Sequence, residues 1–159
     1  MPETTDVTLL IAKRARTLPP LRAENFLRLS LEDFPESPVL WERLTETLLV
    51  LRRPHAAQAA FEHYWRFASD GVTGWRLKAE ILLSLSQPGK ALGAICQLHR
   101  RSPSDLTGWR LKAQALLDLN RCADALIAVD QLHRIAPEDL AGGTLKAAIY
   151  QKMGDHQRV

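Results

Sequence analysis

The segment Trp75-Arg-Leu-Lys-Ala79 recurs, residue for residue, as Trp109-Arg-Leu-Lys-Ala113. The interval between the two tryptophans is the same as the interval between Trp41 and Trp75. A third version of the segment occupies 143–147, where Gly-Thr-Leu-Lys-Ala replaces the tryptophan and the arginine. A fixed interval of this length, about 34 residues, indicates an array of structural repeats.

Alanine and proline keep the same register as the tryptophans. The alanine column holds Ala23, Ala57, Ala91 and Ala125. One proline column holds Pro20, Pro54 and Pro88, and a second holds Pro35, Pro103 and Pro137, with Ser69 in its missing place. The register defines four full units, 4–37, 38–71, 72–105 and 106–139, and a partial unit, 140–159, about one helix long. A chain of this length predicts one domain, 1–159.

Each unit has the pattern of two helices. In the fourth unit, an apolar stripe at helical spacing comprises Trp109, Ala113, Leu116 and Leu117. Asn120-Arg121 interrupts the pattern, and a second stripe follows at Ala125, Val129 and Leu132. The prolines Pro54 and Pro88 suit the first turn of a second helix, where a backbone N–H is not needed. Alternating strand patterns and hairpin turn pairs are absent from the sequence, which predicts an all-α fold.

These columns resemble the signature of the tetratricopeptide repeat (TPR) family, which favours tryptophan and small residues in the first helix and alanine and proline in the second half of each repeat. The matching residues are Trp41, Trp75, Trp109, Ala57, Ala91, Ala125, Pro103 and Pro137. The second unit departs with Thr45 at a small-residue position, the first unit lacks the tryptophan, and the partial unit keeps Ala147 and a turn glycine, Gly154. The resemblance implies a right-handed superhelical solenoid of about four and a half hairpins, in which tryptophans fill the space between successive hairpins.

The resemblance also implies a protein-interaction surface. In this family the first helices line a concave groove, and the corresponding residues here are Glu42, Glu46, Leu49, Arg76, Glu80, Leu83, Arg110, Gln114 and Leu117. We expect Leu49, Leu83 and Leu117 to form an apolar strip on the groove floor. Arg76 and Arg110 are equivalent and are placed to grip a carboxylate or backbone carbonyls of a peptide. The alternative is a solvated face on which Arg76 pairs with Glu80 one turn on.

Other recurring residues favour structural roles. Lys78, Lys112 and Lys146 form a column whose stems are expected to lie along apolar neighbours with the ammonium groups in water. The equivalent pair His99 and His133 predicts half-buried histidines between second helices, because no column of carboxylates or cysteines joins them to make a metal site. The aromatic cluster Tyr64, Trp65 and Phe67 is interpreted as core, with an exposed binding patch as the alternative.

Composition and motifs exclude several classes of protein. The sequence contains no nucleophile-elbow, phosphate-loop or zinc-protease motif, which predicts a chain that is not an enzyme and takes no cofactor or metal. A net charge of +3, with acidic residues on the first helices, argues against nucleic acid. The sequence has no apolar run of membrane-spanning length and no signal peptide, and we expect a cytoplasmic protein without a membrane partner.

The leading hypothesis is a scaffold that binds a peptide or helix of a partner protein. One alternative is a small chaperone of the type III secretion kind, and another is the N-terminal repeat segment of a larger enzyme such as a transferase. The partial fifth unit leaves two further readings open. Residues 140–152 either cap the array, or belong to a fragment or an uncapped docking surface, with Val159 at the next place of the alanine column. Self-association through that end is a related expectation.

Overall fold

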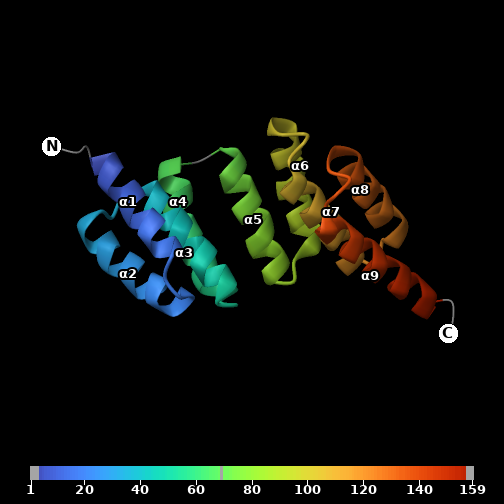
Figure 1. Ribbon diagram of the computed structural model, residues 1–159, viewed down its shortest axis with the longest axis horizontal. Coiled ribbons are helices and arrows are strands. Elements are labelled where there is room, and N and C mark those ends of the chain that lie inside the picture. Colours follow the sequence, from blue (N-terminus) through green and yellow to red (C-terminus); the bar gives the residue numbers. More distant parts are fainter. Residues whose placement is uncertain (1–3, 69, 157–159) are drawn as a thin grey trace. The chain divides into compact units, whose positions relative to one another are not determined.

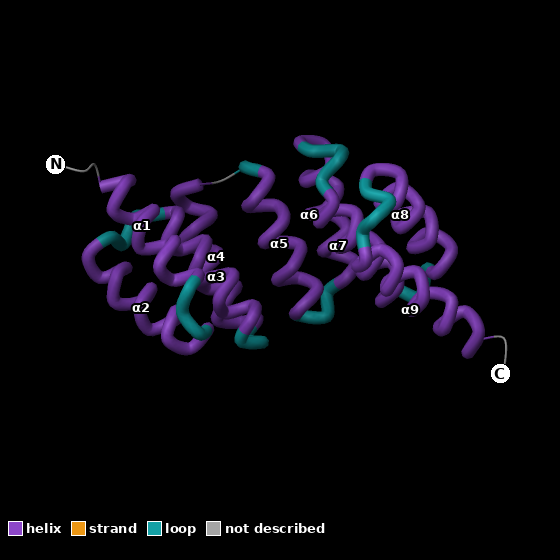
Figure 2. The backbone as a smooth tube through the Cα atoms, viewed as in Figure 1, coloured by secondary structure: helices purple, strands orange, loops and turns teal. Residues whose placement is uncertain are grey.

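The computed structural model describes residues 4–68 and 70–156 and consists, over those residues, of nine helices without a strand (Figure 1). Short loops join the helices (Figure 2). The helices are α1 (Thr4–Arg16), α2 (Pro20–Asp33), α3 (Pro38–Val50), α4 (Pro54–Ala68), α5 (Val72–Ser84), α6 (Pro88–Arg101), α7 (Leu106–Asp118), α8 (Cys122–Ile135) and α9 (Leu140–His156). The predicted all-α helical-repeat fold is confirmed. Ser69 and Val159 lie outside the described residues.

The helices follow the repeats, with odd-numbered first helices and even-numbered second helices. Pro54 and Pro88 each open a second helix, as predicted, and Pro20 opens α2 in the same way, because proline suits the first helical position. Pro103 and Pro137 follow the ends of α6 and α8, where proline prevents the helix from continuing.

The turns inside the hairpins share a backbone conformation that recurs with the repeat. Arg52, Ser86 and Asn120 have φ angles of 57°, 56° and 61°, in the left-handed region. At two of these turns the next residue bonds back to the helix, with Arg53 N donating to the Leu48 carbonyl (3.0 Å) and Arg121 N to the Leu116 carbonyl (2.8 Å). This arrangement satisfies carbonyls at the helix end and reverses the chain within a few residues.

The helices gather into two compact units, unit 1 (Met1–Leu85) and unit 2 (Ser86–Val159). The boundary falls between α5 and α6, and therefore inside the third repeat, 72–105. The repeat register gives no sign of this division. The single domain expected over 1–159 stays a prediction.

Unit 1 has a leucine-rich core between successive helices. Its core includes Leu27, Leu40, Leu44, Leu48 and Leu77. The first helix α3 contacts both neighbouring first helices, α1 and α5. The second helices α2 and α4 do not contact each other within the described residues. The first helices of unit 1 therefore lie closer together than the second helices and form an inner face.

Unit 2 packs α7 against α6, α8 and α9 around Ala113, Leu116, Ala125, Val129 and Ile149. The first helices α7 and α9 again contact each other.

The partial repeat departs from the sequence prediction. The turn predicted at Gly154 is wrong, because α9 continues through this glycine to His156. Ala147, the counterpart of the buried Ala79 and Ala113, is exposed. Within the described residues no second helix follows α9 to cover it.

Candidate functional site

The residues of the repeat signature lie at contacts within and between hairpins. Ala57, Ala91 and Ala125 have no exposed surface. Trp109 stacks on His99 of the preceding hairpin, with ring centroids 4.3 Å apart, and Trp75 meets Trp65 edge-on at 5.0 Å. Trp41 stacks on His63 of its own hairpin at 4.3 Å, and its indole Nε1 donates to the Pro35 carbonyl of the preceding repeat at 2.7 Å.

The stacking partners in the later hairpins belong to one repeat column. The sequence analysis treated its members separately, with Trp65 in the aromatic cluster and His99 and His133 as a histidine pair. Trp65, His99 and His133 follow one another by one repeat length and stand at the same place in successive second helices. The lysine column completes the stack, because Lys78 Nζ lies 5.1 Å from the Trp75 ring centroid and Lys112 Nζ lies 4.9 Å from that of Trp109. These ammonium groups therefore make cation–π contacts with the tryptophan rings.

A glycine column allows the helices to approach at these stacks. Gly74, Gly108 and Gly142 also follow one another by one repeat length, a column that the sequence analysis missed. A Cβ at Gly74 would lie 2.8 Å from the Trp65 ring, and one at Gly108 would lie 2.8 Å from His99 Nε2. Only glycine fits such an approach without a shift of the neighbours.

The aromatic cluster of the second repeat divides between core and surface. Tyr64 is buried in the core of unit 1, as the preferred interpretation held. Trp65 packs half-buried on Phe61, with ring centroids 5.4 Å apart. Phe67 is exposed.

Half-buried charges mark the inner face of unit 1. Burial, followed by the nearby carboxylate of Glu46, raises the pKa of Glu42 above its usual range, and the arginines Arg43, Arg76 and Arg16 partly offset this. Glu46 forms an ion pair with Arg43. Arg76 Nη2 donates to Thr73 Oγ1 at 3.4 Å. The face therefore presents charges of both signs that are partly removed from water.

The predicted groove residues of unit 2 make contacts within that unit. Arg110 forms an ion pair with Asp139, and Gln114 Nε2 donates to Asp118 Oδ1 at 2.7 Å. Leu117 is only 8% exposed and belongs to the core, in contrast with the half-buried Leu49 and Leu83 of unit 1. Leu117 is therefore an internal contact, and the apolar strip expected on a groove floor is accessible only at the two residues of unit 1.

The Arg110–Asp139 pair is tied to the start of α9. Asp139 Oδ2 also accepts the backbone N–H of Gly142 at 2.7 Å, and Asp105 caps α7 in the same way through Gly108 at 2.6 Å. The hydrogen bond from Arg110 is the main cause that holds the pKa of Asp139 below its usual range. The structure thus places Glu42, Glu46, Leu49, Arg76, Glu80 and Leu83 in unit 1 and Arg110, Gln114 and Leu117 in unit 2.

Unit 2 also contains a cleft that the sequence did not predict. It has a volume of about 640 Å³ and lies between α6, α7 and α8, with Cys96, His99, Trp109, Lys112 and Ile127 in its lining. Burial, followed by the charge of Lys112, lowers the pKa of His99. The lining combines one face from each of three helices, which no single helical stripe reveals.

The described residues lack both a membrane-spanning helix and a cluster of metal ligands. No helix there is both long enough and apolar enough to cross a membrane. No group of three or more histidine, cysteine or acidic side chains in that part of the chain is placed to hold a metal ion.

Comparison with known proteins identifies the fold through solved structures. No protein-family model and no curated protein sequence matches the chain. TTC0263, a thermophilic TPR protein of Thermus thermophilus, superposes with a TM-score of 0.80 at 15% identity, over 95% of this chain and 84% of that one. MamA (residues 41 to the end) of Desulfovibrio magneticus RS-1 gives 0.78 at 17%, over 99% and 90%. YrrB, described as a TPR protein with an unusual peptide-binding site, gives 0.69 at 15%, over 94% and 75%. At these identities the likeness establishes the fold.

Proposed function

We propose that this chain, which has the tetratricopeptide repeat fold, is a non-enzymatic interaction module that binds a peptide or helix of a partner protein along the inner faces of its first helices. The observation that carries the proposal is the half-buried carboxylate of Glu42, whose pKa is raised by burial. A charge that is kept partly out of water without a catalytic role is expected at a surface that recognises a ligand. The peptide-binding site ascribed to the structural neighbour YrrB supports the same reading.

The chemistry of unit 1 suits a partner segment of mixed character. Leu49 and Leu83 are half-buried and keep surface available to apolar side chains. Glu42 and Arg76 lie close enough to influence each other electrostatically, so their face offers both an acceptor and a donor. An amphipathic helix or an extended peptide would place apolar anchors on the leucines and use the charges to fix its orientation.

Unit 2 contributes differently. Arg110 already pairs with Asp139, so its charge is compensated within the chain. A guanidinium has five N–H donors, and two nitrogens of Arg110 contact Asp139. The remaining donors suit a neutral backbone carbonyl of the partner better than a free carboxylate. The proposal therefore assigns a carboxylate contact to Arg76 of unit 1 and, separately, a carbonyl contact to Arg110 of unit 2, in place of a joint grip on one carboxylate.

Peptide selection with a matched pair of variants tests this proposal. Peptides are selected from a phage-displayed random library on the wild-type chain and measured against Arg76→Gln and Arg66→Gln. Each variant neutralises one arginine of unit 1, but Arg66 is exposed on the second helix α4. We expect Arg76→Gln to weaken binding about tenfold, the effect of one charge-assisted hydrogen bond. Equal binding by both variants, with circular dichroism showing both folded, would refute the inner-face assignment.

Three narrower expectations belong to the same proposal. The chain acts in the cytoplasm, it does not bind nucleic acid, and it self-associates through the exposed side of α9. Light scattering across a concentration series tests the last of these, and a mass that stays monomeric contradicts it. Retention on heparin at moderate salt would contradict the second.

A further inference from the structure

The junction of α6 and α7 shows how this repeat holds an indole ring. The Trp109 ring stacks on His99 at 4.3 Å, and Lys112 Nζ lies 4.9 Å from its centroid. The indole Nε1 donates to the carbonyl of Pro103 at 2.8 Å. The ring is therefore bound by a stacking partner, a cation and a hydrogen-bond acceptor.

The junction of α8 and α9 repeats each of these partners but has glycine in place of the tryptophan. His133, Pro137 and Lys146 follow their counterparts by one repeat length, and Gly143 takes the place of Trp109. The backbone approach is also the same. A Cβ at Gly142 would lie 3.0 Å from both His133 Nε2 and Leu132 Cδ2, and one at Gly108 would lie 2.8 Å from His99 Nε2 and 2.9 Å from Leu98 Cδ2.

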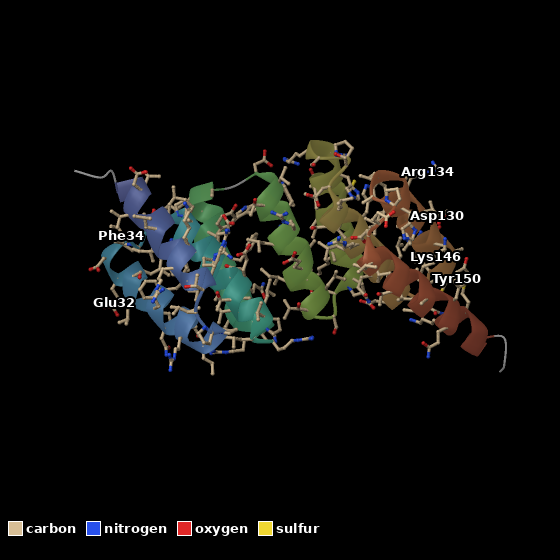
Figure 3. All side chains as sticks on the ribbon, viewed as in Figure 1. Glu32, Phe34, Asp130, Arg134, Lys146 and Tyr150 are labelled. Atoms are coloured by element: carbon tan, nitrogen blue, oxygen red, sulfur yellow. The ribbon has the colours of Figure 1, made fainter. Side chains whose placement is uncertain are left out.

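The surface at this junction is accessible. Gly143 is exposed, and a Cβ added there would meet nothing within 4 Å. The side chains of Lys146, on α9, and Asp130, on α8, are labelled in Figure 3. Lys146 Nζ donates to Asp130 Oδ1 at 3.0 Å, and the two side chains are 36% and 55% exposed. Asp130 takes the place in α8 that Cys96 has in α6. Lys112 therefore lies over an indole at the first junction, whereas the equivalent Lys146 pairs with a carboxylate at the second.

We propose that the aromatic-binding face formed by His133, Gly143 and Lys146 binds a tryptophan side chain of a partner protein. The charge complementarity is specific, because the Lys146 ammonium suits the negative face of an aromatic ring. His133 provides a ring for stacking, and the Pro137 carbonyl is the counterpart of the acceptor that Trp109 uses. Tryptophan is the residue that supplies both a large ring and an N–H donor. This face uses none of the inner-face residues, so the proposal is independent of the proposed peptide groove.

Titration with a single amino-acid probe tests the site directly. The ¹⁵N-labelled chain is titrated with N-acetyl-tryptophanamide and, separately, with N-acetyl-leucinamide. We expect the tryptophan probe to shift the backbone signals around His133 and residues 140–146 with millimolar affinity, and the leucine probe to leave them in place. Absence of shifts there, or equal shifts with both probes, overturns the proposal.

A matched pair of glycine variants makes the result unambiguous. Gly143→Trp supplies the indole within the chain, whereas Gly93→Trp places one on α6, where an added Cβ also meets nothing within 4 Å. We expect Gly143→Trp to abolish the shifts caused by the probe and to raise the melting temperature of the chain above that of Gly93→Trp. A probe that still binds Gly143→Trp, or equal melting temperatures for the two variants, overturns the proposal. A probe site formed by a second copy would instead weaken on dilution of the protein and also count against it.

Discussion

The guanidinium of Arg110, on α7, pairs with the carboxylate of Asp139, which precedes α9. Asp139 accepts the backbone N–H of Gly142 at the same time. One carboxylate thus links a first helix to the first turn of the next one. Arg110, which the sequence assigns to partner recognition, therefore also contributes to the packing of unit 2.

Replacement of Arg110 should remove the hydrogen bond that lowers the pKa of Asp139. In Arg110→Gln we expect the pKa of Asp139 to rise toward its ordinary value near 3.8, because the arginine hydrogen bond is the main cause of its depression. The stability that the pair contributes is present above that ordinary value and is lost as the pH falls through the lower pKa of the folded state. The variant should therefore lose less stability than the wild type over this acid range. Carboxyl ¹³C NMR titration measures the pKa directly.

The control for this experiment is Arg121→Gln, which breaks the ion pair of Arg121 with Asp124 on the same unit. Its Asp139 signal should titrate as in the wild type. An unchanged Asp139 midpoint in Arg110→Gln would contradict the pairing.

The sequence predicts the helices well because their signals are local and periodic. Pro54 and Pro88 mark the starts of second helices, and the alanine column marks the contact between the helices of a hairpin. The glycine column at Gly74, Gly108 and Gly142 carries the same period and was available to the same reasoning.

The candidate site is predicted less well because it depends on contacts between repeats. Leu117 has the helical position of Leu49 and Leu83, but α9 covers it, with Lys152 Nζ donating to its backbone carbonyl at 2.7 Å. The pairing of Arg110 joins residues 29 positions apart. A helical stripe identifies which side chains share a face, and only packing decides which of them another helix covers.

Truncation of Trp109 should destabilise unit 2. We expect Trp109→Ala to cost about 3 kcal/mol, at the lower end of values for buried aromatic residues, because the ring is half-buried. Trp109→Phe keeps a ring over His99 and loses the hydrogen bond to Pro103, so its cost should be about 1 kcal/mol. Urea unfolding of the two variants compares these costs. Equal losses would show that the stack contributes nothing beyond the hydrogen bond.

His99 should make the stability of unit 2 depend on pH. The pKa of His99 in the folded state lies below its ordinary value near 6.5. The side chain therefore contributes stability above pH 6.5, and this stability is lost as the pH falls through the pKa of the folded state. Between about pH 7.5 and about pH 5, the melting temperature of the wild type should fall more steeply than that of His99→Gln. His55→Gln, at an exposed position, should keep the wild-type slope. Identical slopes for all three proteins would contradict the burial of His99.

Glu42 should have the opposite dependence. Because its pKa is raised above the ordinary value near 4.5, the folded state loses stability as the pH rises through that raised pKa. Glu42→Gln should therefore have a higher melting temperature than the wild type at neutral pH, and the gain should vanish below about pH 4.5. Glu62→Gln, on the exposed side of α4, is the control and should change little. A neutral-pH loss in Glu42→Gln would mean that attraction by Arg43 and Arg76 exceeds the cost of burial.

Two glycine-to-alanine substitutions in unit 2 should change the unfolding free energy in opposite directions. At Gly108 a Cβ would lie 2.8 Å from His99 Nε2 and 2.9 Å from Leu98 Cδ2, and both side chains are held in place, so Gly108→Ala should cost about 1–3 kcal/mol. Gly93 also lies within a helix, α6, but an added Cβ there meets nothing within 4 Å. Gly93→Ala should therefore stabilise by about 0.5–1 kcal/mol through reduced backbone entropy in the unfolded chain. Urea unfolding measures both values, and stabilisation by Gly108→Ala would mean that α6 and α7 do not approach as closely as the glycine column requires.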